Sequence, residues 1–432
     1  MNTTDAQPKR MIVRTRKKTI IGNAMSLFSV QFANYLLPLI TFPYLVHVLG
    51  VEKFGLLSFV FSLIQYFVII TDYGFNYTAT RQVSIYRENK DKLSSIFWTV
   101  MIIKLCMLIV SLAFLMGIIY WIPKFNSDRA LYLISATALI GGVLFPVWYF
   151  QGTERIVVMS IVNLLSKVIL TVFLFIYIKS PKDINVAAFI MAAGPLFSGV
   201  ILFVVAVSSG GMSFFTPKWQ DIKESLRDGW AVFITQISGA LLNNSNVFIL
   251  GLFVPPTMVG YYAIADKIVR AVINLVGPIS ASIFPFTSQL FNQAVKEGEL
   301  FVRRIIRPGT IVFGVLSLSL FIFAGFLAKI ISGQPSQLIT LYIRLMAISP
   351  FTIFIDNMYG VQVLLNIGRK NAFMWAVLLP GVLSVALSFL FVPKYGGLAT
   401  ALIFVLSELL VLTLMIIAVR SHHICLYADK LF

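Results

Sequence analysis

The sequence LSSIFWTVMIIKLCMLIVSLAFLMGIIY, residues 93–120, contains a single charged residue, Lys104. A hydrocarbon core about 30 Å thick needs roughly 20 predominantly apolar residues of helix to cross it. This stretch therefore predicts a transmembrane helix. Similar stretches recur along nearly the whole chain with short polar connections between them, so little sequence remains for a soluble catalytic domain. We predict an all-α integral membrane protein.

The apolar stretches divide into twelve predicted transmembrane helices. They cover residues 19–41, 54–79, 93–120, 130–150, 157–179, 185–208, 228–253, 259–290, 305–330, 337–366, 371–391 and 397–419. The clearest boundary is SSGGMSFFTPKWQ at 208–220, with six helices on either side. The predicted organisation is a basic N-terminal tail (1–18), an N-lobe (19–208), an inter-lobe linker (209–227), a C-lobe (228–419) and a C-terminal tail (420–432).

Short sequence matches link the two predicted six-helix lobes. VLGVEKFGLLSF at 48–59 and ILGLFVPPTMVGYY at 249–262 each place Leu-Gly, a short loop and then a glycine that opens a new helix. Because each half has an even number of spans, both halves have the same orientation, and the repeat is a parallel pseudo-repeat about an axis along the membrane normal. Two such lobes facing each other predict a cleft between them.

The charge distribution predicts the orientation in the membrane. Charged residues are only 12% of the chain, yet the formal net charge is +17. Lys and Arg within the tails and connections, or within three residues of them, number 22 on the side of the N-terminus and 7 on the opposite side. By the positive-inside rule, both termini are predicted to be cytoplasmic. The excess of positive charge then indicates contact with anionic membrane lipids, and no nucleic-acid partner is expected.

Several functional classes lack their sequence signatures. Cys106 and Cys425 are far apart and the three His residues show no paired spacing, so we expect no metal site. There is no GxxxxGK[ST] loop for ATP, and we expect no cofactor and no enzymatic activity. The longest predicted outer connection, 42–53, has twelve residues, and the next longest, 121–129, has nine. Connections this short disfavour a membrane glycan polymerase or ligase.

Eight ionisable residues lie well inside predicted spans, at a cost of about 2.5–3.5 kcal/mol each if they faced lipid. They are Lys104, Lys167, Asp266, Lys267, Arg270, Arg344, Asp356 and Glu408. Such side chains must pair with each other or line a wet cavity. Asp266 and Arg270 are spaced i, i+4 and can form an ion pair on one helix. Purely structural pairing therefore stays open as an alternative to a binding role.

The five cations among these residues outnumber the three acids, which predicts an electropositive cavity suited to a phosphate or pyrophosphate. The candidate substrate-binding residues are Lys267, Arg270, Lys167, Arg344 and Lys104. Amide side chains predict a polar lumen for carbohydrate hydroxyls, with helix-to-helix hydrogen bonds as the alternative; they are Gln31, Asn34, Gln65, Asn76, Gln236, Asn243 and Asn274. The candidates for ion coupling are Asp72, Asp266, Asp356 and Glu408. Pro38 and Pro43 are predicted to end the first span, and Pro278, Pro285 and Pro350 predict kinks or breaks in the eighth and tenth spans.

Four sequence blocks resemble the bacterial polysaccharide flippases of the O-antigen Wzx type. They are LLPLITFPYLVHVLGVEKFGLLSFVFSLIQYFVIITDYGFNYTATR at 36–81, WYFQGTER at 148–155, VGYYAIADKIVRAV at 259–272 and FVPKYGGLATALIFVLSELL at 391–410. The resemblance places the chain in the multidrug/oligosaccharidyl-lipid/polysaccharide exporter superfamily. It implies two six-helix lobes around a cationic cavity, in the bacterial inner membrane.

The same resemblance implies a function. Such proteins translocate an undecaprenyl-pyrophosphate-linked oligosaccharide from the cytoplasmic to the periplasmic leaflet for surface polysaccharide synthesis, with a polysaccharide polymerase and chain-length proteins as partners. The charged positions inside matched blocks are Asp72, Arg81, Asp266, Lys267, Arg270 and Glu408. Other readings stay open: an ion-coupled multidrug antiporter of the same superfamily, a glycan polymerase or ligase, and a lipid II flippase, although lipid II flippases typically have fourteen spans.

Overall fold

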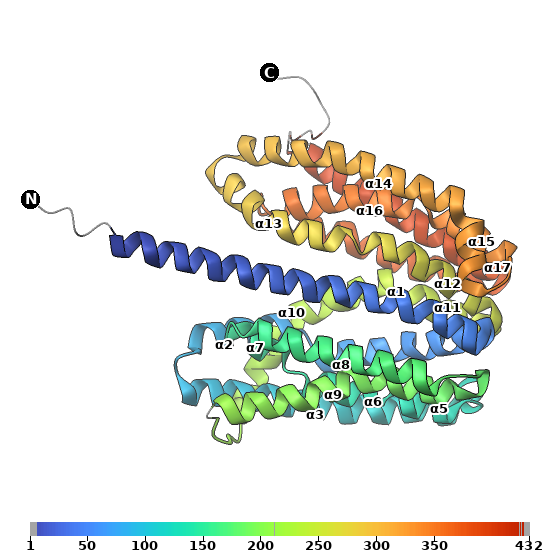
Figure 1. The fold of residues 1–432 in the computed structure, drawn as a ribbon, viewed down its shortest axis with the longest axis horizontal. Coiled ribbons are helices and arrows are strands. Elements are labelled where there is room, and N and C mark those ends of the chain that lie inside the picture. Colours follow the sequence, from blue (N-terminus) through green and yellow to red (C-terminus); the bar gives the residue numbers. More distant parts are fainter. Residues whose placement is uncertain (1–6, 211, 423, 425, 427–432) are drawn as a thin grey trace, which may run out of the picture.

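A computed structural model describes residues 7–210, 212–422, 424 and 426 of the chain; within these, the side chains of 7–36, 209, 210, 242 and 243 are not described. The described residues form helices and no strand (Figure 1). The first half contains α1 (Gln7–Asp72), α2 (Phe75–Tyr86), α3 (Lys90–Trp121), α4 (Pro123–Asn126), α5 (Arg129–Ser135), α6 (Thr137–Leu144), α7 (Val147–Gly152), α8 (Ile156–Tyr177), the 3₁₀ helix η1 (Pro181–Asp183) and α9 (Ile184–Gly210). The second half contains α10 (Trp219–Asn243), α11 (Ser245–Phe253), α12 (Pro256–Ile273), α13 (Val276–Gln293), α14 (Val295–Ser332), α15 (Gln337–Met346), α16 (Ser349–Tyr359), the π-helix η2 (Gly360–Leu364) and α17 (Lys370–Arg420).

Nine helical segments among the described residues are long and apolar enough to cross a membrane. Two of them, Leu37–Tyr86 and Lys370–Arg420, contain 50 and 51 residues, more than twice the roughly 20 that one crossing requires. Each is interrupted by a glycine with positive φ, Gly50 (φ 78°) in α1 and Gly396 (φ 55°) in α17. The predicted count of twelve spans stays a prediction.

The glycine in α1 reverses the direction of the chain. Phe42 and Phe54 lie on either side of Gly50, and their ring centroids are 5.4 Å apart. In a straight helix, twelve residues would separate these positions by about 18 Å. The conformation at Gly50 is left-handed, which glycine adopts without a steric penalty. The chain therefore folds back on itself, and the two parts of α1 pack side by side.

Prolines interrupt two further segments that the sequence treats as single spans. The predicted span 259–290 divides into α12 and α13 just before Pro278, and the predicted span 337–366 divides into α15 and α16 just before Pro350. A proline in the first turn of a helix is tolerated because its missing N–H has no helical partner there. The predicted breaks at these two prolines are confirmed. At Pro285, by contrast, α13 continues without interruption. The prediction that Pro38 and Pro43 end the first span is wrong, because α1 continues through both and is interrupted only at Gly50.

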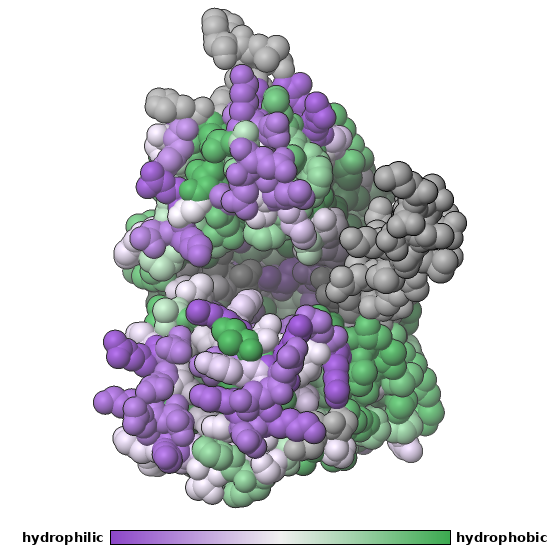
Figure 2. Space-filling view, turned by 90° about the vertical axis from the view of Figure 1, so that its left-hand side faces the viewer, coloured by the Kyte–Doolittle hydropathy of each residue, from purple (hydrophilic) through white to green (hydrophobic). Residues whose placement is uncertain are grey.

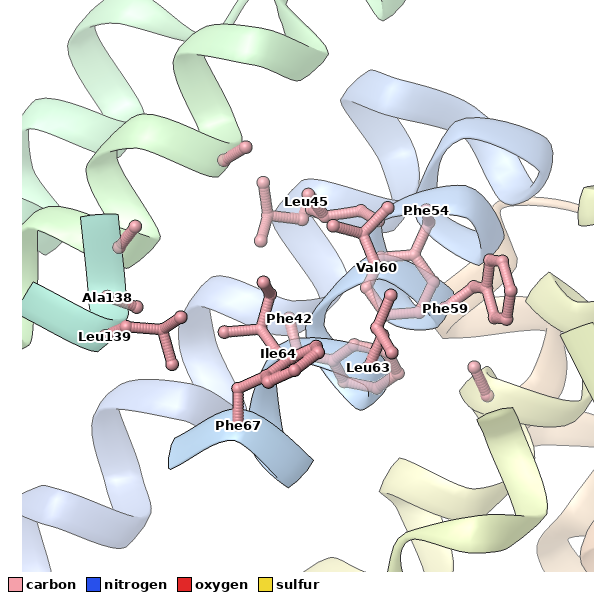
Figure 3. Close-up of a cluster of buried hydrophobic side chains, with 14 of the residues drawn as sticks. Phe42, Leu45, Phe54, Phe59, Val60, Leu63, Ile64, Phe67, Ala138 and Leu139 are labelled. Carbon is pink, nitrogen blue, oxygen red and sulfur yellow. The ribbon is translucent and has the colours of Figure 1, made fainter. Parts of the chain in front are cut away.

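Figure 1 shows the helices gathered in two groups, with α2–α9 in one and α12–α17 in the other, while the first part of α1 runs between them. The groups come together at the end where α1 reverses. Figure 3 shows the core at this end, where the side chains of Phe42, Leu45, Phe54, Phe59 and Val60 and their neighbours interlock. We call the end where residues 50–59 meet residues 251–260 the sealed end. The opposite end, with residues 77–92 and 221–228, is the open end.

Candidate functional site

Close backbone packing joins the two halves at the sealed end. A Cβ atom on Gly55 of α1 would lie 2.5 Å from the backbone N and 2.8 Å from the Cα of Gly260 on α12. A Cβ on Gly260 would likewise overlap the carbonyl group of Val51. Only glycines allow two helices to approach this closely. The helices of the two halves are therefore in direct backbone contact here.

Two side-chain interactions reinforce the sealed end. The Nζ of Lys124 on α4 donates a hydrogen bond to the carbonyl oxygen of Leu252 at 2.6 Å, which joins the first half to α11. Partial burial lowers the pKa of the Lys124 ammonium. The ring of Phe59 stacks on Phe125 on one side and on Phe248 on the other, with centroids 5.7 and 5.8 Å away. Aromatic rings therefore fill the space behind the glycine contact.

Four cavities lead from the open end to this seal, and each shares lining residues with the next. Cavity A (about 290 Å³) shares Gln65 and Asn244 with cavity B (about 480 Å³). Cavity B shares Asn76 and Gln236 with cavity C (about 590 Å³), which in turn shares Arg81 with cavity D (about 500 Å³). Figure 2 looks at the open end and shows a recess between the two halves, with polar residues at its floor. The cavities therefore form one polar path between the halves.

Cavity A is lined by two cations and one acid. Asp266, Lys267 and Arg270 of α12 line it. The Arg270 Nε lies 2.8 Å from each Asp266 carboxylate oxygen, and its guanidinium lies over the ring of Phe404, 5.6 Å from the centroid. Lys267 is exposed to the cavity and has no carboxylate within salt-bridge distance in the described part of the chain. Lys267 is therefore the cation that is available to an anionic ligand.

Cavity B contains an ion pair between two helices. Lys104 of α3 is 2% exposed, and its Nζ lies 3.5 Å from Asp72 Oδ1 and donates to the carbonyl oxygen of Gly142 at 3.2 Å. The Gln236 amide of α10 donates to Asp72 Oδ2 at 3.5 Å. Since each charge has an opposite partner, this part of the path carries little net charge. Asp72 also connects the two halves of the chain through Gln236.

Asp72 owes its position to a break in the helix. It is the last residue of α1, and Tyr73 (φ 46°) and Gly74 (φ 83°) separate it from α2. The Tyr73 ring stacks on Phe233 of α10, with centroids 4.7 Å apart. A left-handed conformation at a residue other than glycine is uncommon and needs support from its surroundings. The packing against α10 supplies that support.

Cavity C continues the path with a single charged residue, Arg81, and cavity D forms a charged mouth. Thr80, Ser84 and Gln151 line cavity C together with Arg81. The mouth, cavity D, is lined by two cations and three acids: Arg81, Lys92, Asp221, Glu224 and Asp228. Their number makes the mouth net negative if all five are ionised.

One face of α1 and α2 supplies polar residues along the whole path. At steps of three, four or seven residues along the chain, this face carries Ser58, Ser62, Gln65, Asp72, Asn76, Thr80 and Ser84, and each of them lines at least one of the four cavities. Residues at this spacing lie on the same side of a helix. Sequence reasoning missed Ser58, Ser62, Thr80, Ser84 and Gln151. The helical spacing of the polar residues is the signal that could have found the first four.

The structure gathers most of the predicted site residues, but not all. Lys267, Arg270, Asp266 and Gln65 line cavity A, while Lys104, Asp72, Asn76, Gln236 and again Gln65 line cavity B. Glu408 is buried behind Arg270 and interacts electrostatically with Arg270 and with Asp356. The side chains of Gln31, Asn34 and Asn243 lie outside the described part of the structure.

Besides Asp356 and Glu408, three predicted residues line none of the four cavities. Arg344 is exposed and lies over the ring of Phe321, 5.6 Å from its centroid, and Lys167 lies partly exposed on α8. Asn274 is exposed at the break after α12, where its backbone N–H donates to the Arg270 carbonyl at 2.8 Å. The break interrupts the helical stripe that the sequence predicts from Lys267 to Asn274. These three residues therefore do not share a cavity with Lys267.

The path between two helical groups defines a membrane transport protein, and comparison with known proteins identifies its family. Residues 20–291 match the family model described as "Polysaccharide biosynthesis protein". The chain belongs to this family. With its nine apolar helical segments in the described residues, it is a multi-pass inner-membrane protein.

Relatives and solved structures agree with this assignment. The chain is 32% identical over 411 residues to a protein of Escherichia coli (strain K12) named "Putative O-antigen transporter", covering 95% of this chain and 99% of that protein. It is 26% identical to a protein of the same name from Shigella dysenteriae, over 92% of this chain and 99% of the relative. An inward-facing multidrug resistance MATE family transporter of the MOP superfamily has the same fold, with a TM-score of 0.67 and 13% identity over 92% of this chain and 100% of the other.

Proposed function

We propose that this protein is a flippase. It moves an undecaprenyl-pyrophosphate-linked oligosaccharide from the cytoplasmic to the periplasmic leaflet for surface polysaccharide synthesis, without catalysing a reaction. The family, and the name of the Escherichia coli and Shigella relatives, support transport of an O-antigen-like glycan. A polysaccharide polymerase and chain-length proteins then act on the glycan on the periplasmic side.

One observation carries the proposal: the polar path ends at Lys267, next to a closed seal. The cavities extend from the open end to cavity A, where Lys267 faces the lumen without an acid partner among the described residues. Lysine is a common ligand for phosphate, and a cation with reduced access to water binds it more strongly. A pyrophosphate therefore fits cavity A, while the polyprenyl tail stays in the lipid.

Transport requires a second conformation in which the sealed end is open and the open end is closed. With the N-terminus in the cytoplasm, as the distribution of Lys and Arg predicts, the open end faces the cytoplasm and receives substrate. Rocking of the two predicted six-helix lobes then opens the periplasmic end. The membrane potential supplies about 2.3 kcal/mol per charge per 100 mV. Asp72, Asp266, Asp356 and Glu408 are the candidate carriers of a coupled ion.

Reversal of the charge at Lys267 tests the proposal. Lys267→Glu places a carboxylate where the pyrophosphate binds, so surface glycan is lost and lipid-linked oligosaccharide accumulates in the cytoplasmic leaflet. Lys267 is a better position than Arg270, because Arg270→Glu would also leave Asp266 without its partner. Lys329→Glu, at an exposed lysine outside the four cavities, is the matched control. Normal glycan export by Lys267→Glu, inserted at wild-type levels, contradicts the proposal.

A multidrug antiporter is the alternative, and the MATE-like fold favours it. Such a protein would move organic cations, for which Asp72 and the acidic mouth would be attractive. Under this alternative, Lys267→Glu improves the export of a cationic dye, because it removes a repulsive charge. Under the flippase proposal, the variant leaves dye accumulation in cells unchanged.

A further inference from the structure

The charge of the lining residues changes sign along the path. Cavity A contains two cations and one acid, and cavity B contains the balanced pair of Lys104 and Asp72. Cavity C has one charged residue, Arg81, which it shares with the mouth, and the mouth as a whole contains three acids and two cations. An anionic group is thus attracted at the sealed end and opposed by Asp221, Glu224 and Asp228 at the open end. A ligand that is anionic at one end only is therefore favoured with that end at the sealed end of the path.

The residues that cavities B and C share are uncharged: Asn76, Val147 and Gln236. An amide side chain both donates and accepts hydrogen bonds, and so does a sugar hydroxyl, whereas the oxygens of an ionised pyrophosphate only accept them. The region where the two cavities meet consequently suits a glycan better than a phosphate group.

The length of the path also supports separate regions for the pyrophosphate and for the glycan. The polar face of α1 and α2 extends from Ser58 to Ser84, which at 1.5 Å per residue is about 39 Å of helix. Cavity A occupies only one end of this face. The remainder is lined mainly by amides and hydroxyls, which exchange hydrogen bonds with sugars as water does. The path is therefore far longer than a pyrophosphate requires.

We propose that the substrate binds in one orientation, with its pyrophosphate at Lys267 and its sugar chain extended through cavities B and C toward the open end. Gln151 and Thr80 in cavity C then contact sugars distant from the pyrophosphate, and they determine how long a glycan is bound. This inference rests on the proposed flippase function. It assigns the glycan a binding site that is separate from the cationic site.

The test compares two substrates in proteoliposomes that contain the full chain. One is undecaprenyl-pyrophosphate carrying a single N-acetylhexosamine, and the other is the same lipid carrying a complete oligosaccharide repeat. Translocation is measured as the fraction oxidised by membrane-impermeant periodate. The double variant Gln151→Leu, Thr80→Val should slow transport of the long substrate about tenfold, because hydrogen bonds to sugars are lost. Transport of the short substrate should stay within twofold of wild type.

Two further variants complete the test. Lys267→Gln should slow both substrates, since both carry the pyrophosphate, and Thr235→Val, at an exposed residue beside Gln236 that lines no cavity, should slow neither. Transport of the short substrate shows that the double variant is folded. The proposed orientation is overturned if the double variant slows both substrates equally or slows neither. It is also overturned if Lys267→Gln slows transport of the long substrate only. If the wild-type protein moves neither substrate, the flippase proposal itself fails.

Discussion

Replacement of Gly55 by alanine should weaken the seal between the two halves. The added Cβ would overlap the carbonyl oxygen of Pro256 and would lie 2.8 Å from the Gly260 Cα. Carbon atoms in contact are ordinarily about 3.5–4.0 Å apart, so the contact with Gly260 alone requires α1 and α12 to separate by about 0.7–1.2 Å. The obstructing atoms belong to the backbone, and no side-chain rotation can relieve the overlap.

The expected size of the effect follows from the cost of overpacking. An extra methyl group in a close-packed contact typically costs about 1–3 kcal/mol. If only the sealed state bears this cost, the ratio of open to sealed molecules rises about 5- to 150-fold. The hydrogen bond from Lys124 to Leu252 lies at the same end and should lengthen as the helices separate.

A single cysteine in cavity A measures the opening. Ser58→Cys, in a chain whose two native cysteines are replaced by serine, places a thiol in cavity A close to the seal. A membrane-impermeant maleimide added outside intact cells should label it at least about fivefold faster in Gly55→Ala. Gly194→Ala is the matched control, because its Cβ would lie an ordinary 3.5 Å from Leu170. Unchanged labelling in a stably inserted Gly55→Ala protein would refute this account of the seal.

Three further outcomes are expected. Lys104→Met should lower the melting temperature in detergent, because it leaves the Asp72 carboxylate without its partner, and a buried unpaired charge costs about 3–5 kcal/mol. Adding Asp72→Leu should restore much of the lost stability. If it does not, the ion pair is not the cause of the loss. Lys167→Gln should retain glycan export in a cell-surface assay, and Lys267→Gln should lose it, because only Lys267 lines the path. Loss of export in both variants would show that the four cavities do not define the site. Gln362→Leu should destabilise the second half by about 1–3 kcal/mol. The buried Gln362 amide donates two hydrogen bonds to a serine of α13, and the leucine cannot make them. Thermal unfolding identical to that of the wild type would exclude a structural role for the π-helix.

Local sequence patterns predicted much of the helical structure. The predicted breaks at Pro278 and Pro350 occur because a proline removes a backbone hydrogen bond wherever the rest of the chain lies. The ion pair of Asp266 and Arg270 follows from i, i+4 spacing on one helix. The polar face of α1 and α2 was readable by the same rule, although sequence reasoning singled out only some of its members.

Long-range contacts were beyond this kind of reasoning. Lys104, Lys167 and Arg344 look alike in the sequence, each a lone cation in an apolar stretch. Only the packing of α3 against the end of α1 pairs Lys104 with Asp72, and only the position of α15 against α14 places Arg344 over an exposed ring. The interactions of Glu408 with Arg270 and Asp356 likewise join separate helices.

The sequence by itself determined that this is a helical membrane protein, and it indicated which residue types a path between its helices could use. Its apolar stretches must be helical, because lipid offers no partner for an unpaired backbone group. The tertiary structure alone decided which cations share a cavity, where the halves touch and which end is open. Hydropathy cannot decide these points, because residues that face lipid and residues that face another helix are equally apolar.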